Sequence, residues 1–227
     1  MFFNLFNKNV AADYPEYWTQ YIQTFKSPLH KDTPLSEVRF VVVDTETTGV
    51  NPKKDRILSI AAVRIQDNQL DVSDSFEYYI ENDNINTDSI NIHGILPHGK
   101  QAKVSEENAL KSFVDYCGNS IIVGHHIGFD MAILNAIAKK LVSDELRNKT
   151  IDTASMSIRI EKVKSDYYFQ QQDYSLDALT SRYQIPTNDR HTAAGDAYMT
   201  AILFLKLLTL LQKKGVDTLG KLMNGMR

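Results

Sequence analysis

The 227-residue sequence has a single cysteine, Cys117, and no long uninterrupted apolar segment. One thiol excludes an internal disulfide framework and a zinc site built from several thiolates. The longest apolar run covers residues 201–211 and is interrupted by Lys206. It is shorter than the about 20 residues that a membrane span needs. We therefore interpret this run as part of a core helix and expect no membrane association.

An excess of positive charge is also lacking. The 25 Lys and Arg residues stand against 28 Asp and Glu residues, and the formal net charge is −3. This balance argues against a protein that coats nucleic acid by bulk charge, although an enzyme that holds a strand end through metal ions remains compatible with it. Residues 1–6 lack the basic n-region and cleavage site of a secretory signal, so we expect a cytoplasmic protein.

Residues 1–35 differ in pattern from the rest of the chain. Aromatic and apolar residues recur there at spacings of three and four, which predicts an amphipathic helix. They are Tyr14, Tyr17, Trp18, Tyr21, Ile22 and Phe25. We interpret residues 1–35 as an N-terminal helical arm, residues 36–215 as the main domain and residues 216–227 as a C-terminal tail. The stripe favours packing on the domain's own core over contact with a partner.

The remaining pattern predicts an α/β domain. We expect strands over residues 39–43, 57–65, 71–80, 120–124 and 151–153. We expect helices over residues 106–117, 130–142, 176–183 and 193–214. The polar joint at residues 67–69 predicts a hairpin, and residues 162–173 are expected to form a loop. This order of elements indicates a mixed sheet with helices on its faces.

Four acidic residues lie where such a sheet can bring them together. Asp44 and Glu46 follow a buried strand, and side-chain alternation places them on the same side. Asp130 and Asp196 lie near the starts of two helices, and His191 precedes Asp196. Taken singly, each has an ordinary structural role: solvated acids at a strand end, a helix cap, a surface histidine.

Taken together, these residues indicate metal-dependent chemistry. Carboxylates held close together destabilise a fold unless a cation lies between them. Their hard oxygens suit Mg²⁺ or Mn²⁺ better than Zn²⁺. Two such ions can clamp the attacking and leaving oxygens of a phosphodiester, and a neutral imidazole is suited to accept a proton from water. The pattern therefore predicts phosphodiester hydrolysis.

Three segments resemble the motifs of the DEDDh 3′–5′ exonucleases, in particular the DNA polymerase III epsilon-subunit-like branch. Residues 44–49 (Asp-Thr-Glu-Thr-Thr-Gly) resemble the first motif, residues 124–130 the second and residues 191–197 the third. Residues 92–95 and 174–179 resemble further family segments, and the resemblance covers about residues 37–212. It implies a ribonuclease H-like fold. It also implies that two Mg²⁺ or Mn²⁺ ions are held by Asp44, Glu46, Asp130 and Asp196, with His191 as the general base.

The resemblance further implies contacts with the terminal nucleotide of a nucleic acid 3′ end. They involve Thr45, Thr47, Ile92, His93, His126 and Phe129, and His126 stands where the family commonly has Asn. We expect an exonuclease that releases nucleoside 5′-monophosphates from single-stranded DNA ends, of proofreading or repair type. The alternatives are an exoribonuclease of the same superfamily and a nucleic-acid-binding module without chemistry.

Two further expectations concern the surroundings of the predicted site. Few residues follow the third motif, so we expect a free-standing exonuclease, with residues 1–35 as the candidate contact for a polymerase or a second copy of the chain. Basic residues near the site are expected to form a solvated face. They are Lys139, Arg182 and Arg190.

Overall fold

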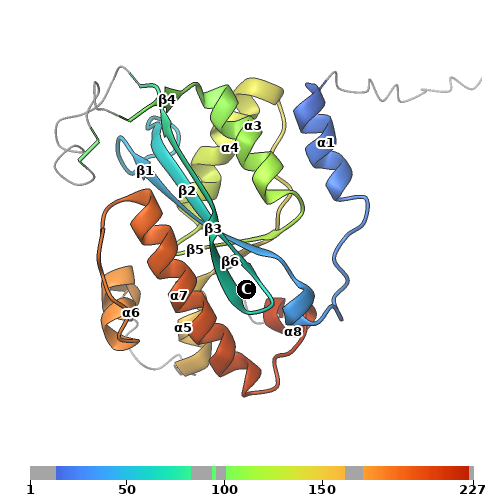
Figure 1. Cartoon of the computed structure of the whole chain (residues 1–227), viewed down its shortest axis with the longest axis vertical. Coiled ribbons are helices and arrows are strands. Elements are labelled where there is room, and N and C mark those ends of the chain that lie inside the picture. Colours follow the sequence, from blue (N-terminus) through green and yellow to red (C-terminus); the bar gives the residue numbers. More distant parts are fainter. Residues whose placement is uncertain (1–13, 83–93, 96–100, 162–170, 225–227) are drawn as a thin grey trace, which may run out of the picture.

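The computed structural model describes residues 14–82, 94–95, 101–161 and 171–224, and within these ranges the fold is one mixed sheet with helices on both faces (Figure 1). The strands of this sheet follow the order β4-β3-β2-β1-β5-β6. Strands β1, β2 and β3 are antiparallel, whereas β5 runs parallel to β1, β6 to β5, and β4 to β3. Their bounds are Phe40–Thr47 (β1), Ile57–Gln66 (β2), Gln69–Ile80 (β3), Lys103–Val104 (β4), Ile121–Gly124 (β5) and Thr150–Asp152 (β6).

Two groups of helices cover the sheet. Helix α7, with α5, α6 and α8, lies on one face, and α3 and α4, with α1 beyond them, lie on the other (Figure 1). Short 3₁₀ helices occupy Leu35–Glu37 and Gln171–Tyr174. The helix bounds are Glu16–Thr24 (α1), Glu106–Cys117 (α3), Gly128–Val142 (α4), Thr153–Glu161 (α5), Leu176–Arg182 (α6), Ala193–Gln212 (α7) and Leu219–Met223 (α8).

The strand β1 is buried on both faces, which explains its continuous apolar sequence. Phe40 and Val42 pack in the cluster that contains the α7 side chains, whereas Val41 and Val43 pack in the cluster that contains α3 and α4. Asp67 and Asn68 connect β2 and β3 with positive φ angles of 51° and 57°, as in a type I′ hairpin. The predicted hairpin is confirmed.

The apolar stripe of α1 packs on the core of the domain. Trp18 and Tyr21 are buried against the α3–α4 side. Trp18 Nε1 donates a hydrogen bond to Asp144 Oδ2 (3.0 Å), and Tyr21 Oη donates one to Asn148 Oδ1 (2.6 Å). The described part of the predicted arm is therefore joined to the domain along its apolar side.

The described part of the predicted C-terminal tail also belongs to the core. Leu219 and Leu222 of α8 are buried in the same cluster as Leu35, and a β-bridge joins Pro34 to Thr218. Residues before 36 and after 215 thus contribute side chains to the core of the segment between them.

Three elements were not expected from the sequence: β4, α5 and α8. The buried residues of α5 include Thr153, Ala154 and Ser157, which are too small or polar to produce an apolar periodicity. Of the predicted loop, residues 162–170 lie outside the described residues, and the rest forms a 3₁₀ helix. Helix α7 is long and apolar enough to span a membrane, yet 56% of its most apolar window is buried inside the fold, which identifies it as a core helix.

Candidate active site

The carboxyl end of β1 carries the first two acidic residues. Asp44 and Glu46 continue the alternation of Phe40 and Val42, so their side chains point to the face covered by α7. The pairing of β1 with β5 ends at Val42, two residues before Asp44. A crevice at the carboxyl ends of parallel strands is the usual binding position in an open α/β sheet.

Helix α7 supplies the third acid. Thr192 caps this helix, since its Oγ1 accepts a hydrogen bond from the Gly195 N–H (3.0 Å), and Asp196 lies buried in the first turn. Asp44, Glu46 and Asp196 each offer a carboxylate oxygen, and these oxygens lie within 4.8 Å of one another. The structure thus brings together three of the four acids that the sequence singled out.

Asp130 approaches from the opposite side of β1. It is buried in the first turn of α4, and its Oδ1 accepts a hydrogen bond of 2.6 Å from Thr45 Oγ1. Thr45 lies between Asp44 and Glu46 and faces the α4 side of the sheet. The charge of Asp130 acts on Asp44 and Glu46, so the fourth acid lies within electrostatic range of these two. The side-chain role of Thr45 was not expected from the sequence.

The cluster is electrostatically unfavourable without a cation. Burial, reinforced by the charges of Asp130 and Asp196, raises the pKa of Asp44 well above its usual value. Burial raises the pKa of Glu46 to about 7. It also raises the pKa of Asp130 to about 7, against the hydrogen bond from Thr45. Ionised carboxylates at these positions therefore require a compensating positive charge.

One such charge comes from the protein itself. The Arg190 guanidinium forms an ion pair with Asp196, and its Nε donates to Asp177 Oδ1 on α6 (2.6 Å). Burial raises the pKa of Asp196, and Arg190 limits this rise. The Arg190 side chain is only 20% exposed, so the expected solvated face is wrong for this residue. The expectation fits Lys139 and Arg182 better, because they form partly exposed ion pairs with other acids.

The predicted general base precedes Asp196 closely in the chain. His191 is exposed and has a positive φ angle of 62°, in the turn directly before α7. Its ring is within electrostatic range of Asp196. Arg190 and His191 are adjacent in the chain, so the residue that binds Asp196 also anchors the turn that carries His191.

The N-terminal end of α4 carries two predicted nucleotide contacts. His126 is exposed, with a φ angle of 55°, and its ring centroid lies 4.4 Å from that of His125. Burial, and then His126, lower the pKa of His125 to about 4, and its Nδ1 lies 2.9 Å from Thr153 Oγ1. Phe129 is half-buried against the α3–α4 core, which an ordinary packing role also explains.

The other predicted contacts are placed only in part. Thr47 Oγ1 donates a hydrogen bond to the Gly49 carbonyl (2.7 Å), closing the turn after β1. Ile92 and His93 lie outside the described residues.

The donor set fits a hard divalent cation. Asp196 Oδ1 is buried and has no hydrogen-bond partner among the described residues. Asp44 and Glu46 add further carboxylate oxygens within 4.8 Å. An all-oxygen set of this kind suits Mg²⁺ or Mn²⁺.

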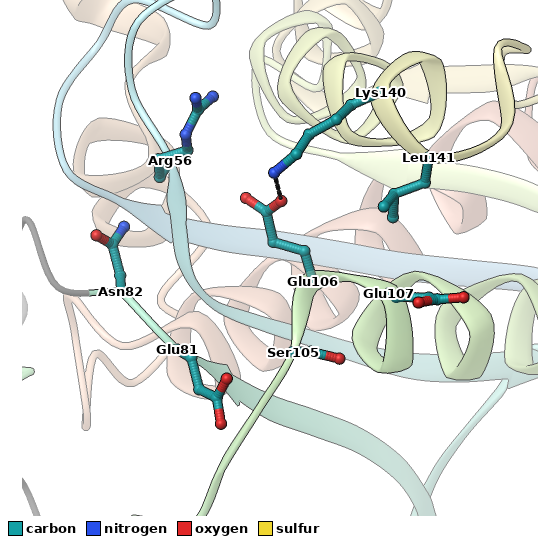
Figure 2. Close-up of a pocket in the computed structure, with 8 residues that line it drawn as sticks. All are labelled: Arg56, Glu81, Asn82, Ser105, Glu106, Glu107, Lys140 and Leu141. Atoms are coloured by element: carbon teal, nitrogen blue, oxygen red, sulfur yellow. Dashed lines mark hydrogen bonds and ion pairs between the residues drawn. The ribbon is translucent and has the colours of Figure 1, made fainter.

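A separate cavity of about 460 Å³ lies on the α3–α4 side of the sheet (Figure 2). An ion pair between Lys140 and Glu106 (2.5 Å) crosses it, and Arg56, Glu81 and Glu107 add charges of both signs. None of the four clustered acids lines this cavity, and its opposite charges favour no single class of ligand.

The sequence and the fold are similar to those of known exonucleases. The chain is 32% identical over 197 residues to a DNA polymerase III PolC-type protein of Thermotoga petrophila, covering 86% of this chain and 14% of the relative. It is 33% identical over 204 residues to a DNA polymerase III subunit epsilon-like protein of Rhodobacter capsulatus, covering 86% and 27%. The chain thus spans less than a third of these relatives.

Among solved structures, E. coli exonuclease I in complex with a dT13 oligonucleotide matches with a TM-score of 0.64 and 18% identity. The match covers 79% of this chain and 43% of that one. It confirms the predicted ribonuclease H-like fold. Residues 41–204 match the RNase_T family, described as exonuclease, and because this match covers most of the sequence, the chain belongs to that exonuclease family.

Proposed function

We propose that this chain is a metal-dependent 3′–5′ exonuclease that releases nucleoside 5′-monophosphates from single-stranded DNA ends, in proofreading or repair. The observation that carries the proposal is the convergence of Asp44, Glu46 and Asp196 in a chain of the exonuclease family, with Asp130 within electrostatic range of Asp44 and Glu46. The oligonucleotide in the exonuclease I complex and the polymerase names of the relatives favour DNA as the substrate.

In this proposal the acidic residues would hold two Mg²⁺ or Mn²⁺ ions. Such ions supply the positive charge that stabilises the developing negative charge of a phosphodiester undergoing hydrolysis. Asp44, Glu46 and Asp196 contribute oxygens from the α7 side, and Asp130 contributes from the α4 side, oriented by Thr45. In this proposal, residues on both sides of β1 contribute to one metal site.

His191 is proposed to accept the proton of the attacking water. It is exposed, so water can reach it, and an imidazole ring is suited to proton transfer near neutral pH. Arg190 limits the movement of the turn by its bonds to Asp177 and Asp196. The general base is therefore tied to one of the proposed metal ligands.

The terminal nucleotide is proposed to lie between the end of β1 and the start of α4. Thr45 and Thr47 would border it with their backbone, and His126 and Phe129 would border it with their rings. Aromatic rings such as Phe129 stack on nucleobases. Ile92 and His93 belong to this proposed set through the family resemblance alone.

Contact with a polymerase remains a proposal that the PolC-type relatives suggest. Trp18 and Tyr21 are buried in the domain core, so a contact with a polymerase or a second copy through the arm would use the exposed side of α1 or residues 1–13.

The first test uses 5′-labelled single-stranded DNA and RNA of matched sequence, with Mg²⁺ or Mn²⁺ and with EDTA. We expect a DNA ladder that shortens from the 3′ end in the wild type and is abolished by Asp44→Ala, His191→Ala and EDTA. Asp115→Ala removes an exposed acid on α3 and is the matched control, with wild-type activity expected. Preferential shortening of RNA would assign an exoribonuclease, and binding without degradation would assign a binding module.

A small chromogenic substrate isolates the chemistry from strand binding. We expect Mn²⁺-dependent hydrolysis of thymidine 5′-monophosphate p-nitrophenyl ester, lost in Asp44→Ala. If the wild type hydrolyses neither this ester nor the oligonucleotides, the proposed function is wrong.

A further inference from the structure

A groove of about 440 Å³ lies between the end of β3 and the start of α7. Two side chains of β3, two residues of α7 and part of the turn before α7 form most of its lining. They are Glu77, Tyr79, Gly195, Tyr198, Asn188 and Asp189. The groove therefore begins within one residue of Asp196 in the chain.

The sheet register places this groove beside the carboxylate cluster. Glu46 pairs with Ser59 across β1 and β2, and Ser59 pairs with Tyr79 across β2 and β3. Paired residues share a face of the sheet, so Tyr79 lies on the α7 face with Glu46. Because neighbouring strands are about 4.8 Å apart, Tyr79 lies about 10 Å from Glu46 along this row. A nucleic acid strand whose scissile phosphodiester lies at the carboxylate cluster can therefore extend over the groove.

The groove is suited to a base rather than to a phosphate. Among its described lining residues there is no Lys or Arg, whereas the carboxylates of Glu77 and Asp189 are present. These carboxylates repel phosphate but accept hydrogen bonds from the amino and imino groups of bases. Tyr79 Oη donates to Glu77 Oε1 (3.0 Å), which satisfies its polar end.

An exposed aromatic ring adds a stacking surface. Tyr198 is 43% exposed, and the other large exposed hydrophobic side chains in the described part of the chain are the aliphatic Val50 and Val72. Tyrosine rings stack on any nucleobase, which gives binding without sequence preference.

One wall of the groove is the turn before α7, and the same turn carries the proposed general base, His191. A Cβ atom at Gly195 would lie 2.0 Å from the Asp189 carbonyl oxygen, so the turn packs directly on the helix backbone. Thr192 Oγ1 donates to that same carbonyl (2.7 Å), and His191 lies between Asp189 and Thr192 in the chain. A ligand in the groove therefore touches the turn that carries His191.

We propose that the groove between Tyr79 and Tyr198 binds a nucleobase of the substrate strand, upstream of the scissile phosphodiester. This inference rests on the proposed exonuclease function and adds a subsite that a single-nucleotide ester does not reach. Stacking on Tyr198 holds the base, and the acidic lining keeps phosphates on the side of the cations. Occupation of the groove also holds the His191 turn in place during hydrolysis.

The test compares an oligonucleotide with the p-nitrophenyl ester of thymidine 5′-monophosphate. Tyr198→Ala is expected to lower the ratio of kcat/KM for the oligonucleotide to kcat/KM for the ester by about 5- to 150-fold, the range of base–aromatic stacking. Tyr198→Phe keeps the ring and is expected to keep the ratio. Val72→Ala removes an exposed side chain near the β2–β3 hairpin, at the far end of β3, and is the matched control.

Oligonucleotides with one abasic site locate the base. An abasic site at the upstream position that occupies the groove should slow the wild type and erase the difference between wild type and Tyr198→Ala. Equal ratios for wild type and Tyr198→Ala, with the ester hydrolysed normally, would overturn the groove while leaving the proposed function intact.

A binding measurement tests the groove if the wild type shows no hydrolysis. If the wild type hydrolyses neither substrate, the proposed function fails, and the anisotropy of a labelled dT oligonucleotide in Ca²⁺ tests the groove instead. Weaker binding by Tyr198→Ala would then support the groove, and equal binding would refute it.

Discussion

Replacing Glu46 by glutamine measures how strongly the carboxylate cluster opposes folding when no cation is bound. Burial, and then the charge of Asp196, raise the pKa of Glu46 from 4.5 to about 7. The folded protein thus holds a proton on Glu46 more tightly than the unfolded chain does, and ionisation of Glu46 destabilises the fold. The contribution of this group to stability is fully present below about pH 4.5 and is lost as the pH rises through about 7.

The magnitude follows from the two pKa values. Each pH unit between them corresponds to about 1.4 kcal/mol, so ionised Glu46 destabilises the metal-free fold by at most about 3 kcal/mol. Water screens a half-buried side chain, and we therefore expect about 1–3 kcal/mol. For a chain of this length the melting temperature changes by roughly 2–4 °C for each kcal/mol. Glu46→Gln should therefore melt about 2–12 °C above the wild type at pH 8 in EDTA.

Thermal unfolding in EDTA at pH 5 and pH 8, followed by calorimetry, tests this expectation. The advantage of Glu46→Gln should shrink at pH 5, where the wild-type carboxyl is largely protonated. Mn²⁺ at about 100 times its Kd should stabilise the wild type by about 2.7 kcal/mol and the variant by less, because the variant lacks one ligand. Glu107→Gln removes an exposed acid of α3 and should behave as the wild type. A variant that melts at or below the wild type at pH 8, or an equal response to Mn²⁺, would refute the reasoning.

Three further substitutions test other contacts of the fold and the site. Arg190→Ala should destabilise the metal-free protein by about 3 kcal/mol, because buried Asp196 loses its counter-ion, and unchanged melting in EDTA would contradict this. Thr45→Val should shift the acidic limb of the pH–rate profile to higher pH by about one unit, because Asp130 loses a hydrogen bond that lowers its pKa. An acidic limb at the wild-type pH would argue against the hydrogen bond between Thr45 and Asp130. Trp18→Ala should lower the free energy of unfolding in urea by about 3–5 kcal/mol, and a variant as stable as the wild type would show that α1 is not part of the core.

The regular elements with strong apolar patterns were predictable from the sequence. The strands before Asp44 and after Arg56, the hairpin at Asp67–Asn68 and the long helix after Thr192 all lie within a few residues of their predicted positions. Elements without such a pattern were missed. Strand β4 has two residues, and α8 has five, which is too short for a periodicity to be visible.

The shared side of Asp44 and Glu46 and the place of Asp196 near a helix start were also predictable, because alternation along a strand and position in a helix are local properties. The partners of these acids depend on tertiary distances instead. Arg190 reaches two acids on different helices, and nothing in its flanking residues distinguishes it from a solvated arginine. Thr45 was expected to contribute its backbone. The role of its hydroxyl was missed because the partner, Asp130, comes close only where β1 and α4 meet.

The position of Thr45 explains why the two acids of β1 are separated by one residue. Asp44 and Glu46 face α7 and Asp196, whereas the residue between them faces α4 and holds Asp130. One strand therefore orients acids on both sides of the sheet, and it does so only in the observed register with β2, where Glu46 lies opposite Ser59. The register shifts directly after Glu46, so the alternation ends where the cluster ends. A shift of β1 by one residue would turn both acids toward the α3–α4 core and Thr45 toward α7, which would dismantle the cluster and bury two unpaired charges.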